Sequence, residues 1–114
     1  MRAYCTYFDS NYLPQGLAMR SSLERALGHA PNLWVCCMDD ETFDVLSTLN
    51  LDGLNPFRLA DLEKHFPKLL EVKNDRSRIE YYFTCTPAVV RYTMDKNRDS
   101  QFVIYFCFFN NYST

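Results

Sequence analysis

The N-terminal run AYCTYFDSNY, residues 3–12, constrains the fold more than any other stretch of the chain. It is apolar at first, ends abruptly in polar residues and is followed at once by a helix start. A short, continuously apolar run of this kind is typical of a buried strand of a parallel sheet. Open α/β sheets bind ligands just beyond the carboxyl ends of their strands. The polar end of this run is therefore the expected edge of a ligand crevice.

Helix and strand patterns alternate along the rest of the chain. Pro14 suits the first turn of a helix because its missing N–H costs nothing there, and Gly28 suits a helix end. Pro87 lies inside the longest helical pattern and is expected to kink or divide it. The further elements expected are a helix at 13–27, a strand at 32–38, a helix at 41–49, a short strand at 57–59, helices at 61–66, 68–73 and 78–94, and a strand at 101–109.

This alternation predicts an α/β fold, with a mostly parallel, doubly wound sheet and flanking helices in a Rossmann-like arrangement. Right-handed crossovers are expected between the strands. A length of 114 residues suits one small domain or a piece of a larger one.

Composition narrows the function classes. Apolar residues make up 47% of the chain, which is enough to build a core and argues against disorder. The net charge is -2 and the basic residues are scattered, so no nucleic-acid partner is expected. No stretch is long and apolar enough for a transmembrane segment, and the N-terminus lacks the pattern of a signal peptide. A cytoplasmic location is the resulting expectation.

The cysteines predict reduced thiols rather than a disulfide framework. Their number is odd and no CxxC spacing occurs, and His29 and His65 are far apart in sequence, so a zinc site is not expected. Several lie in apolar runs, where a free cysteine behaves as a small hydrophobe. The five cysteines are Cys5, Cys36, Cys37, Cys85 and Cys107.

Candidate binding residues gather at the end of the first expected strand. The chain has no GxGxxG fingerprint and no P-loop, so a dinucleotide fold of the usual kind is disfavoured. Thr6, Asp9, Asn11 and Tyr12 lie where a nucleobase would dock, because a carboxylate accepts a hydrogen bond from a base N–H and a tyrosine ring stacks on a base. The alternative is a plain turn and helix cap, which these residues alone favour.

A second group lies around the start of the helix at 78–94. Arg78 near a helix N-terminus suits a diphosphate, with Thr84 and Thr86 on the sugar side. The alternative is a solvated helix face whose ion pairs contribute little. Asp39 and Asp40 are interpreted as helix caps rather than metal ligands.

A family resemblance sharpens these expectations. The chain resembles the N-terminal part of a glycosyltransferase family 8-like protein, an enzyme of the GT-A fold that uses a nucleotide-diphospho-sugar donor. The resemblance covers residues 3–105. The stretches that carry it are CTYFDSNYLPQGLAMRSSLERA, PNLWVCCMDDETFDVLSTLNL, RLADLE and EYYFTCTPAVVRY.

The resemblance implies roles for several residues. Asp9 would bond a uracil-type ring, Tyr12 would stack on it, and Thr6 would line the same wall. The EYYFTCTP segment would flank the sugar-diphosphate. Many relatives carry an arginine near the position of Thr86, and its absence here removes one expected diphosphate contact.

The chain departs from the family pattern at its C-terminal end. There the family carries a D-x-D motif that holds a divalent cation, manganese or magnesium, as a Lewis acid for the leaving diphosphate. Residues 106–114 read FCFFNNYST instead, so the metal ligands are missing and no catalytic residue is assigned. We expect a single partial nucleotide-sugar-binding domain at 1–114, ending in a frameshift near Phe106.

The resulting prediction is a hexosyltransferase-type glycosyltransferase, truncated before its metal motif and inactive as this chain. It specifies no acceptor. One alternative is a non-catalytic nucleotide-binding module. Another is a non-functional remnant whose bare apolar run at 102–109 favours aggregation.

Overall fold

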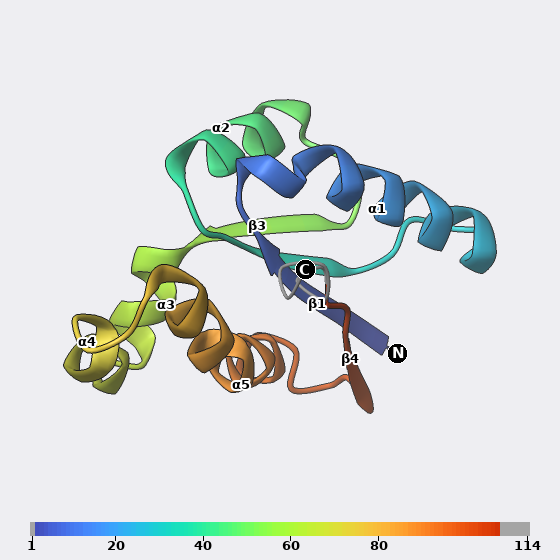
Figure 1. Ribbon diagram of the computed structural model, residues 1–114. Helices are drawn as coiled ribbons and strands as arrows, with labels where there is room; N and C mark the ends of the chain where they lie inside the picture. The colour runs from blue at the N-terminus through green and yellow to red at the C-terminus, as the bar shows by residue number, and fades with distance from the viewer. Residues whose placement is uncertain (1, 108–114) are drawn as a thin grey trace.

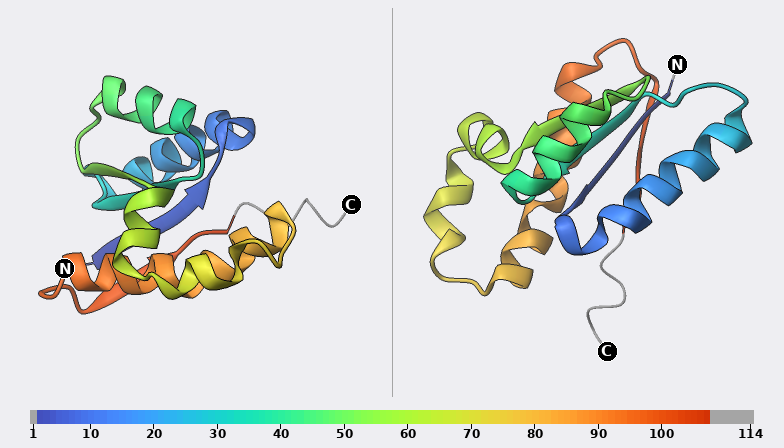
Figure 2. Two further views of the ribbon diagram at one scale, coloured as in Figure 1. Left: turned by 90° about the vertical axis from the view of Figure 1, so that its left-hand side faces the viewer. Right: turned by 90° about the horizontal axis from the view of Figure 1, so that it is seen from above.

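The computed structural model describes residues 2–107, in which a four-stranded parallel sheet lies between two layers of helices. α1 and α2 cover one face of the sheet, and α3, α4 and α5 cover the other (Figure 1, Figure 2). The strand order is β3-β2-β1-β4, and every pairing is parallel. The strands are β1 (Arg2–Phe8), β2 (Leu33–Cys37), β3 (Leu54–Arg58) and β4 (Phe102–Tyr105).

The helices connect consecutive strands, as the alternating pattern predicts. An α/β fold with a parallel sheet is therefore confirmed, and the arrangement is compatible with a Rossmann-like fold. Within residues 2–107, no helix has both the length and the apolar character needed to cross a bilayer. The helices are η1 (Ser10–Tyr12), α1 (Leu13–Leu27), α2 (Asp40–Leu49), α3 (Leu59–His65), α4 (Lys68–Lys73) and α5 (Arg78–Lys96).

β1 is one of the two inner strands of the sheet and is buried on both faces. Successive side chains of a strand point to opposite faces. Cys5 and Tyr7 accordingly pack into the core beneath α5, and Tyr4 and Phe8 pack into the core beneath α1 and α2. The prediction of a buried first strand is confirmed, although the strand ends at Phe8 and residues 10–12 form a turn of 3-10 helix.

A glycine brings α1 close to β1. The aromatic ring of Phe8 lies directly over Gly16, in the space that a Cβ atom at this position would occupy. The start of α1 therefore rests on the end of the strand.

Two strand predictions need correction. The third strand is Leu54–Arg58 rather than 57–59, and it includes Pro56. β3 is an edge strand, which pairs with a neighbour on one side only, and prolines within sheets are found on such strands. The fourth strand ends at Tyr105 rather than at 109, and residues 108–114 lie outside the described residues.

Pro87 does not divide the long helix, which excludes one of the two outcomes predicted for it. α5 runs from Arg78 to Lys96 as one element with Pro87 inside it. Its buried side chains, including Cys85 and Val89, belong to the core beneath the sheet. Tertiary packing of this face supplies most of the stability of a helix and outweighs one missing backbone bond.

Four of the five cysteines are buried and all five are free thiols. Burial raises the pKa of Cys5 and of Cys85 to about 11, so both stay protonated near neutral pH. Cys107 is the exception, since it is exposed rather than buried. It lies two residues beyond the end of β4.

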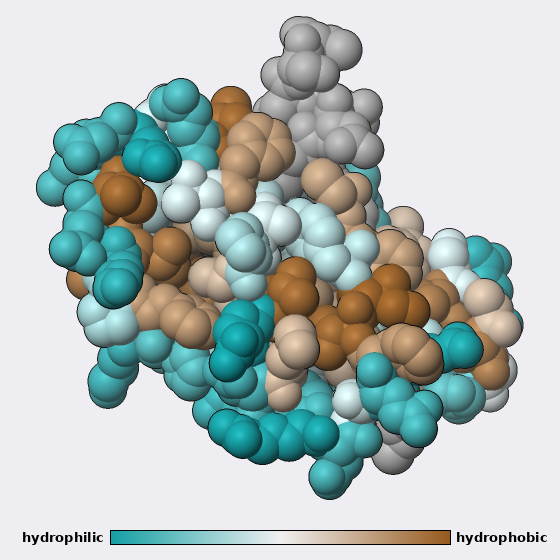
Figure 3. Space-filling view, turned by 90° about the horizontal axis from the view of Figure 1, so that it is seen from below, coloured by the Kyte–Doolittle hydropathy of each residue, from teal (hydrophilic) through white to brown (hydrophobic). Residues whose placement is uncertain are grey.

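The outer surface retains apolar side chains. Figure 3 shows them gathered on the face that α3, α4 and α5 cover. α5 leaves Phe83 and Met94 exposed, and the edge strand β4 leaves Phe102 58% exposed.

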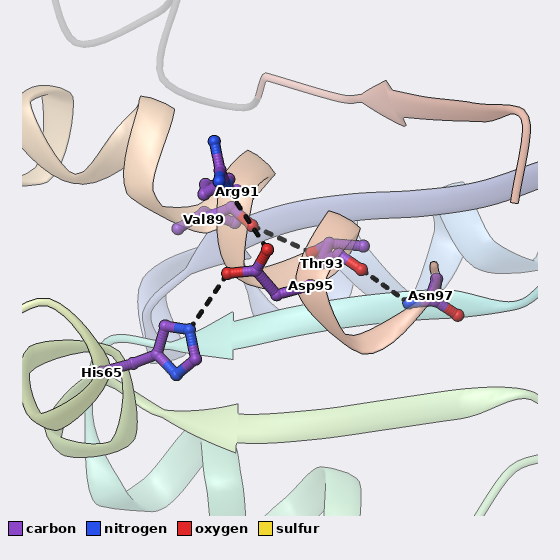
Figure 4. A network of polar contacts seen from close by, with 6 residues as sticks. All are labelled: His65, Val89, Arg91, Thr93, Asp95 and Asn97. Carbon is purple, nitrogen blue, oxygen red and sulfur yellow. Dashed lines mark hydrogen bonds and ion pairs between the residues drawn. The ribbon is translucent and has the colours of Figure 1, made fainter. Parts of the chain in front are cut away.

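The carboxyl end of α5 is fixed by a network of polar contacts (Figure 4). His65 Nε2 lies 3.1 Å from Asp95 Oδ2, and Arg91 Nε donates to Asp95 Oδ1 at 3.2 Å. Asn97 Nδ2 donates to the carbonyl of Thr93 at 2.8 Å. The first contact joins α3 to the last turn of α5, and the other two lie within the end of α5 itself.

Candidate functional site

The candidate site lies just beyond the carboxyl end of β1, between the loop that follows β1 and the start of α5. The chain leaves β1 toward β2 on one side, whereas β4 lies on the other side, so the strand order reverses at this point. Such a switch point opens a crevice beyond the strand ends, and this is where open α/β sheets bind ligands. The polar residues after Phe8 lie at this crevice.

Asp9 is the buried acid of the site. It is only 2% exposed, and its Oδ1 accepts a hydrogen bond from the backbone N–H of Asn11 at 3.0 Å. This bond caps η1, so the cap interpretation of Asp9 is confirmed. Its other oxygen, Oδ2, lies 3.4 Å from Nη2 of Arg78. The acid therefore has one backbone donor and one cationic partner.

Arg78 is the first residue of α5 and leans over the end of β1. Its Nε donates to the hydroxyl of Tyr82 at 3.0 Å, while its side chain stays 66% exposed. The hydrogen bond and the charge interaction with Tyr82, and to a smaller degree the charge of Asp9, raise the pKa of Arg78 above its ordinary value. A hollow of about 140 Å³ lies between these groups. Its lining residues are Asp9, Asn11, Arg78, Ile79 and Tyr82.

Asp39 fixes the loop that carries Asp9. Its Oδ1 accepts from the N–H of Thr42 at 2.9 Å and caps α2, which confirms the cap interpretation. Its Oδ2 accepts from the N–H of Ser10 at 3.0 Å. Burial opposes ionisation, but the hydrogen bonds from Thr42 and Ser10 hold the pKa of Asp39 below its ordinary value. The two loops after β1 and β2 are thus joined by one carboxylate.

Thr6 and Tyr12 do not line this hollow. Thr6 is fully buried, and its hydroxyl donates to the carbonyl of Phe106 at 2.6 Å. It ties β1 to the residue that follows β4. Tyr12 is half-buried and packs against both cores. Of the four residues predicted for base binding, the hollow brings together Asp9 and Asn11.

One face of α5 turns toward the end of β1. Arg78, Tyr82 and Thr86 are spaced four residues apart, which places them on one side of a helix. Thr86 Oγ1 lies 3.0 Å from the hydroxyl of Tyr7, and Arg78 reaches Asp9. The prediction from the residue types placed Arg78 and Thr86 at the site, and the structure puts both on this face.

Thr84 does not belong to that face. Its hydroxyl donates to the carbonyl of Glu80 at 2.9 Å and accepts from Nε of Arg76 at 2.9 Å. Both of these contacts are exposed to solvent, and Thr84 does not line the hollow, so the structure does not bring it together with Arg78 and Thr86. The signal that separates it from Thr86 is the four-residue spacing, which also identifies Tyr82.

The residues present do not fit the divalent cation that the resemblance implies. Residues 2–107 contain no cluster of three or more histidine, cysteine or carboxylate ligands. Asp9 faces the guanidinium of Arg78, and both oxygens of Asp39 accept backbone N–H groups. A cation beside Asp9 would meet the positive charge of Arg78.

Comparison with known proteins identifies a curated relative. The chain is 33% identical over 103 residues to the uncharacterized protein YfnF of Bacillus subtilis (strain 168). The match covers 90% of this chain and 33% of the relative, so the chain spans about a third of the relative's length. No family model and no solved structure matches the chain.

Proposed function

We propose that this chain is the nucleotide-binding part of a glycosyltransferase family 8-like protein and holds the nucleoside diphosphate of a sugar donor. The observation that carries the proposal is the pairing of Asp9 with Arg78 at the switch point. A hydrogen-bond acceptor for a base and a cation for phosphate lie side by side at the edge where α/β sheets bind ligands.

Each group has a distinct task in this proposal. Asp9 accepts a hydrogen bond from a ring N–H of a uracil-type base. Arg78 offers its exposed guanidinium to the diphosphate, which it can bind in a bidentate manner. Arg78 lies at the N-terminus of the 19-residue helix α5, and the positive end of the helix dipole there also favours an anion such as a diphosphate. The binding site is therefore divided between β1 and α5.

Sugar transfer is not proposed for the chain on its own. The leaving diphosphate of a transferase needs electrostatic support as its charge develops. Residues 2–107 hold no metal-ligand cluster, and the sequence has no D-x-D motif. The proposed role is donor binding, with transfer dependent on residues outside this chain.

Isothermal titration calorimetry with uridine diphosphate tests the proposal. The wild-type chain should bind it, and Asp9→Ala should weaken binding at least about tenfold, because a hydrogen bond to a charged group is lost. Asp44→Ala, on the exposed side of α2, is the matched control and should bind as wild type. Absence of binding, or equal affinity in Asp9→Ala, would contradict the proposal.

A non-catalytic nucleotide-binding module is the second candidate. The absence of a metal-ligand cluster among the described residues favours it. Repeating the titration with and without manganese separates the candidates. Metal-independent binding supports the module, and strict dependence on manganese supports a transferase.

A further inference from the structure

We infer that Arg78 makes the site selective for phosphorylated ligands by occupying Asp9 until an anion draws the guanidinium away. The inference rests on the proposed function and adds a specificity-determining residue to it. It follows from how differently the two partners of the ion pair are placed.

Within residues 2–107, the buried charge of Asp9 has no substitute for Arg78. Its side chain is 3% exposed, and its nearest polar contacts are the Asn11 N–H at one oxygen and Arg78 at the other. Breaking a buried pair by removing one partner is strongly unfavourable, because the remaining charge is neither solvated nor neutralised. Asp9 therefore releases Arg78 only when another donor replaces it.

Arg78 is free to move. Its side chain is 66% exposed, and its contact with Asp9 is 3.4 Å long, compared with about 2.7–2.9 Å for a strong charge-assisted hydrogen bond. Its other contacts are with Tyr82, whose hydroxyl accepts from Nε at 3.0 Å and whose ring centroid lies 5.6 Å from Cζ. Because the side chain is largely exposed, water can solvate the guanidinium when it leaves Asp9.

These facts couple the two halves of a nucleotide. A nucleoside must displace Arg78 from Asp9 but offers the guanidinium no new partner. A nucleoside diphosphate offers a base N–H to Asp9 and an anion to Arg78 together. Because coupling free energies are reciprocal, the diphosphate strengthens the base contact as much as the base strengthens the diphosphate contact.

The first test titrates uridine and uridine diphosphate into wild type and Arg78→Gln. Removal of the guanidinium should raise the affinity for uridine about fivefold and lower the affinity for uridine diphosphate at least about tenfold. Arg91→Gln, which makes the same charge change at the other end of α5, is the control and should leave both affinities unchanged. A plain loss of one phosphate contact would lower only the second affinity and would overturn the inference.

A second test uses inorganic pyrophosphate and does not depend on the stability of Arg78→Gln. Asp9→Asn keeps an oxygen that can cap η1 but removes the charge that holds Arg78. Its affinity for pyrophosphate should rise about fivefold over wild type. Unchanged or weaker affinity would overturn the inference. If wild type binds no uridine diphosphate at all, the proposed function itself fails.

Discussion

The two ends of α5 each hold an ion pair centred on an aspartate, but the pairs are built differently. At the amino end, the buried Asp9 has one cationic partner, Arg78, at 3.4 Å. At the carboxyl end, Asp95 is 26% exposed and is held by His65 at 3.1 Å and by Arg91 at 3.2 Å. Water can replace the partners of the second acid but not the partner of the first. In the proposed function the first pair responds to a ligand, whereas the second pair joins α3 to α5.

The largest expected effect is a loss of stability at the carboxyl half of α5 that leaves ligand binding at the amino end unchanged. Tyr92 lies at the carboxyl half of α5, where its ring stacks on Phe57 with centroids 4.2 Å apart and meets the ring of His65. Tyr92→Ala should lower the free energy of unfolding by about 3–5 kcal/mol, as for other buried aromatic truncations. Urea denaturation measures the loss. The folded variant should bind uridine diphosphate as wild type does, and a matching loss of affinity would show that the two ends are not independent.

A smaller effect is expected from removing the buried acid. Asp9→Ala deletes the cap of η1 and the partner of Arg78, so the free energy of unfolding should fall by about 1–2 kcal/mol. The loss in Asp95→Ala should be smaller, because exposed pairs contribute little. Denaturation of both variants in low and in high salt checks the comparison. If Asp95→Ala is the more destabilised of the two, the contrast between the pairs is wrong.

A third test compares two threonines of the same helix. Thr86→Val removes the contact between α5 and the buried Tyr7 hydroxyl and should cost about 1 kcal/mol of stability. Thr84→Val changes only exposed contacts and should cost close to nothing. Thermal melts of the two variants, which have the same change in composition, measure the difference. Equal costs would show that the inward face of α5 is assigned wrongly.

The smallest effect is one of pH. The hydrogen bond with His65, helped by Arg91, lowers the pKa of Asp95 below its ordinary value of 3.8. Because the pKa of Asp95 is lower in the folded than in the unfolded chain, ionised Asp95 stabilises the fold. This contribution is fully present above pH 3.8, the ordinary value, and is lost as the pH falls through the lower pKa of the folded state. The difference in melting temperature between wild type and Asp95→Asn should therefore be present at neutral pH and vanish in acid. A difference that grows as the pH falls would contradict this sign.

Local chemistry made much of the fold predictable. The run at 3–12 identified a buried strand, Pro14 and Gly28 marked the two ends of α1, and Asp39 identified the cap of α2. Each of these depends on neighbours within a few residues. The third strand was misplaced because Pro56 signals a turn locally, whereas its position at the sheet edge depends on the whole topology.

The candidate site was predictable only in part. Asp9 and Arg78 were each identified by residue type, but their pairing spans 69 positions and follows from the order of the strands. The same holds for the second oxygen of Asp39, which reaches Ser10 from another loop. Thr84 was predicted together with Thr86, although helical spacing alone places the two on different faces of α5.

Gly16 has a consequence for how this site tolerates change. The ring of Phe8 fills the volume where any side chain at position 16 would begin. Alanine favours helices over glycine by about 1 kcal/mol, yet here its Cβ would force either the buried Phe8 ring or the start of α1 to shift. If position 16 is randomised and folded variants are selected, glycine should be recovered almost exclusively. The constraint comes from packing alone, because glycine contributes no side chain to the site.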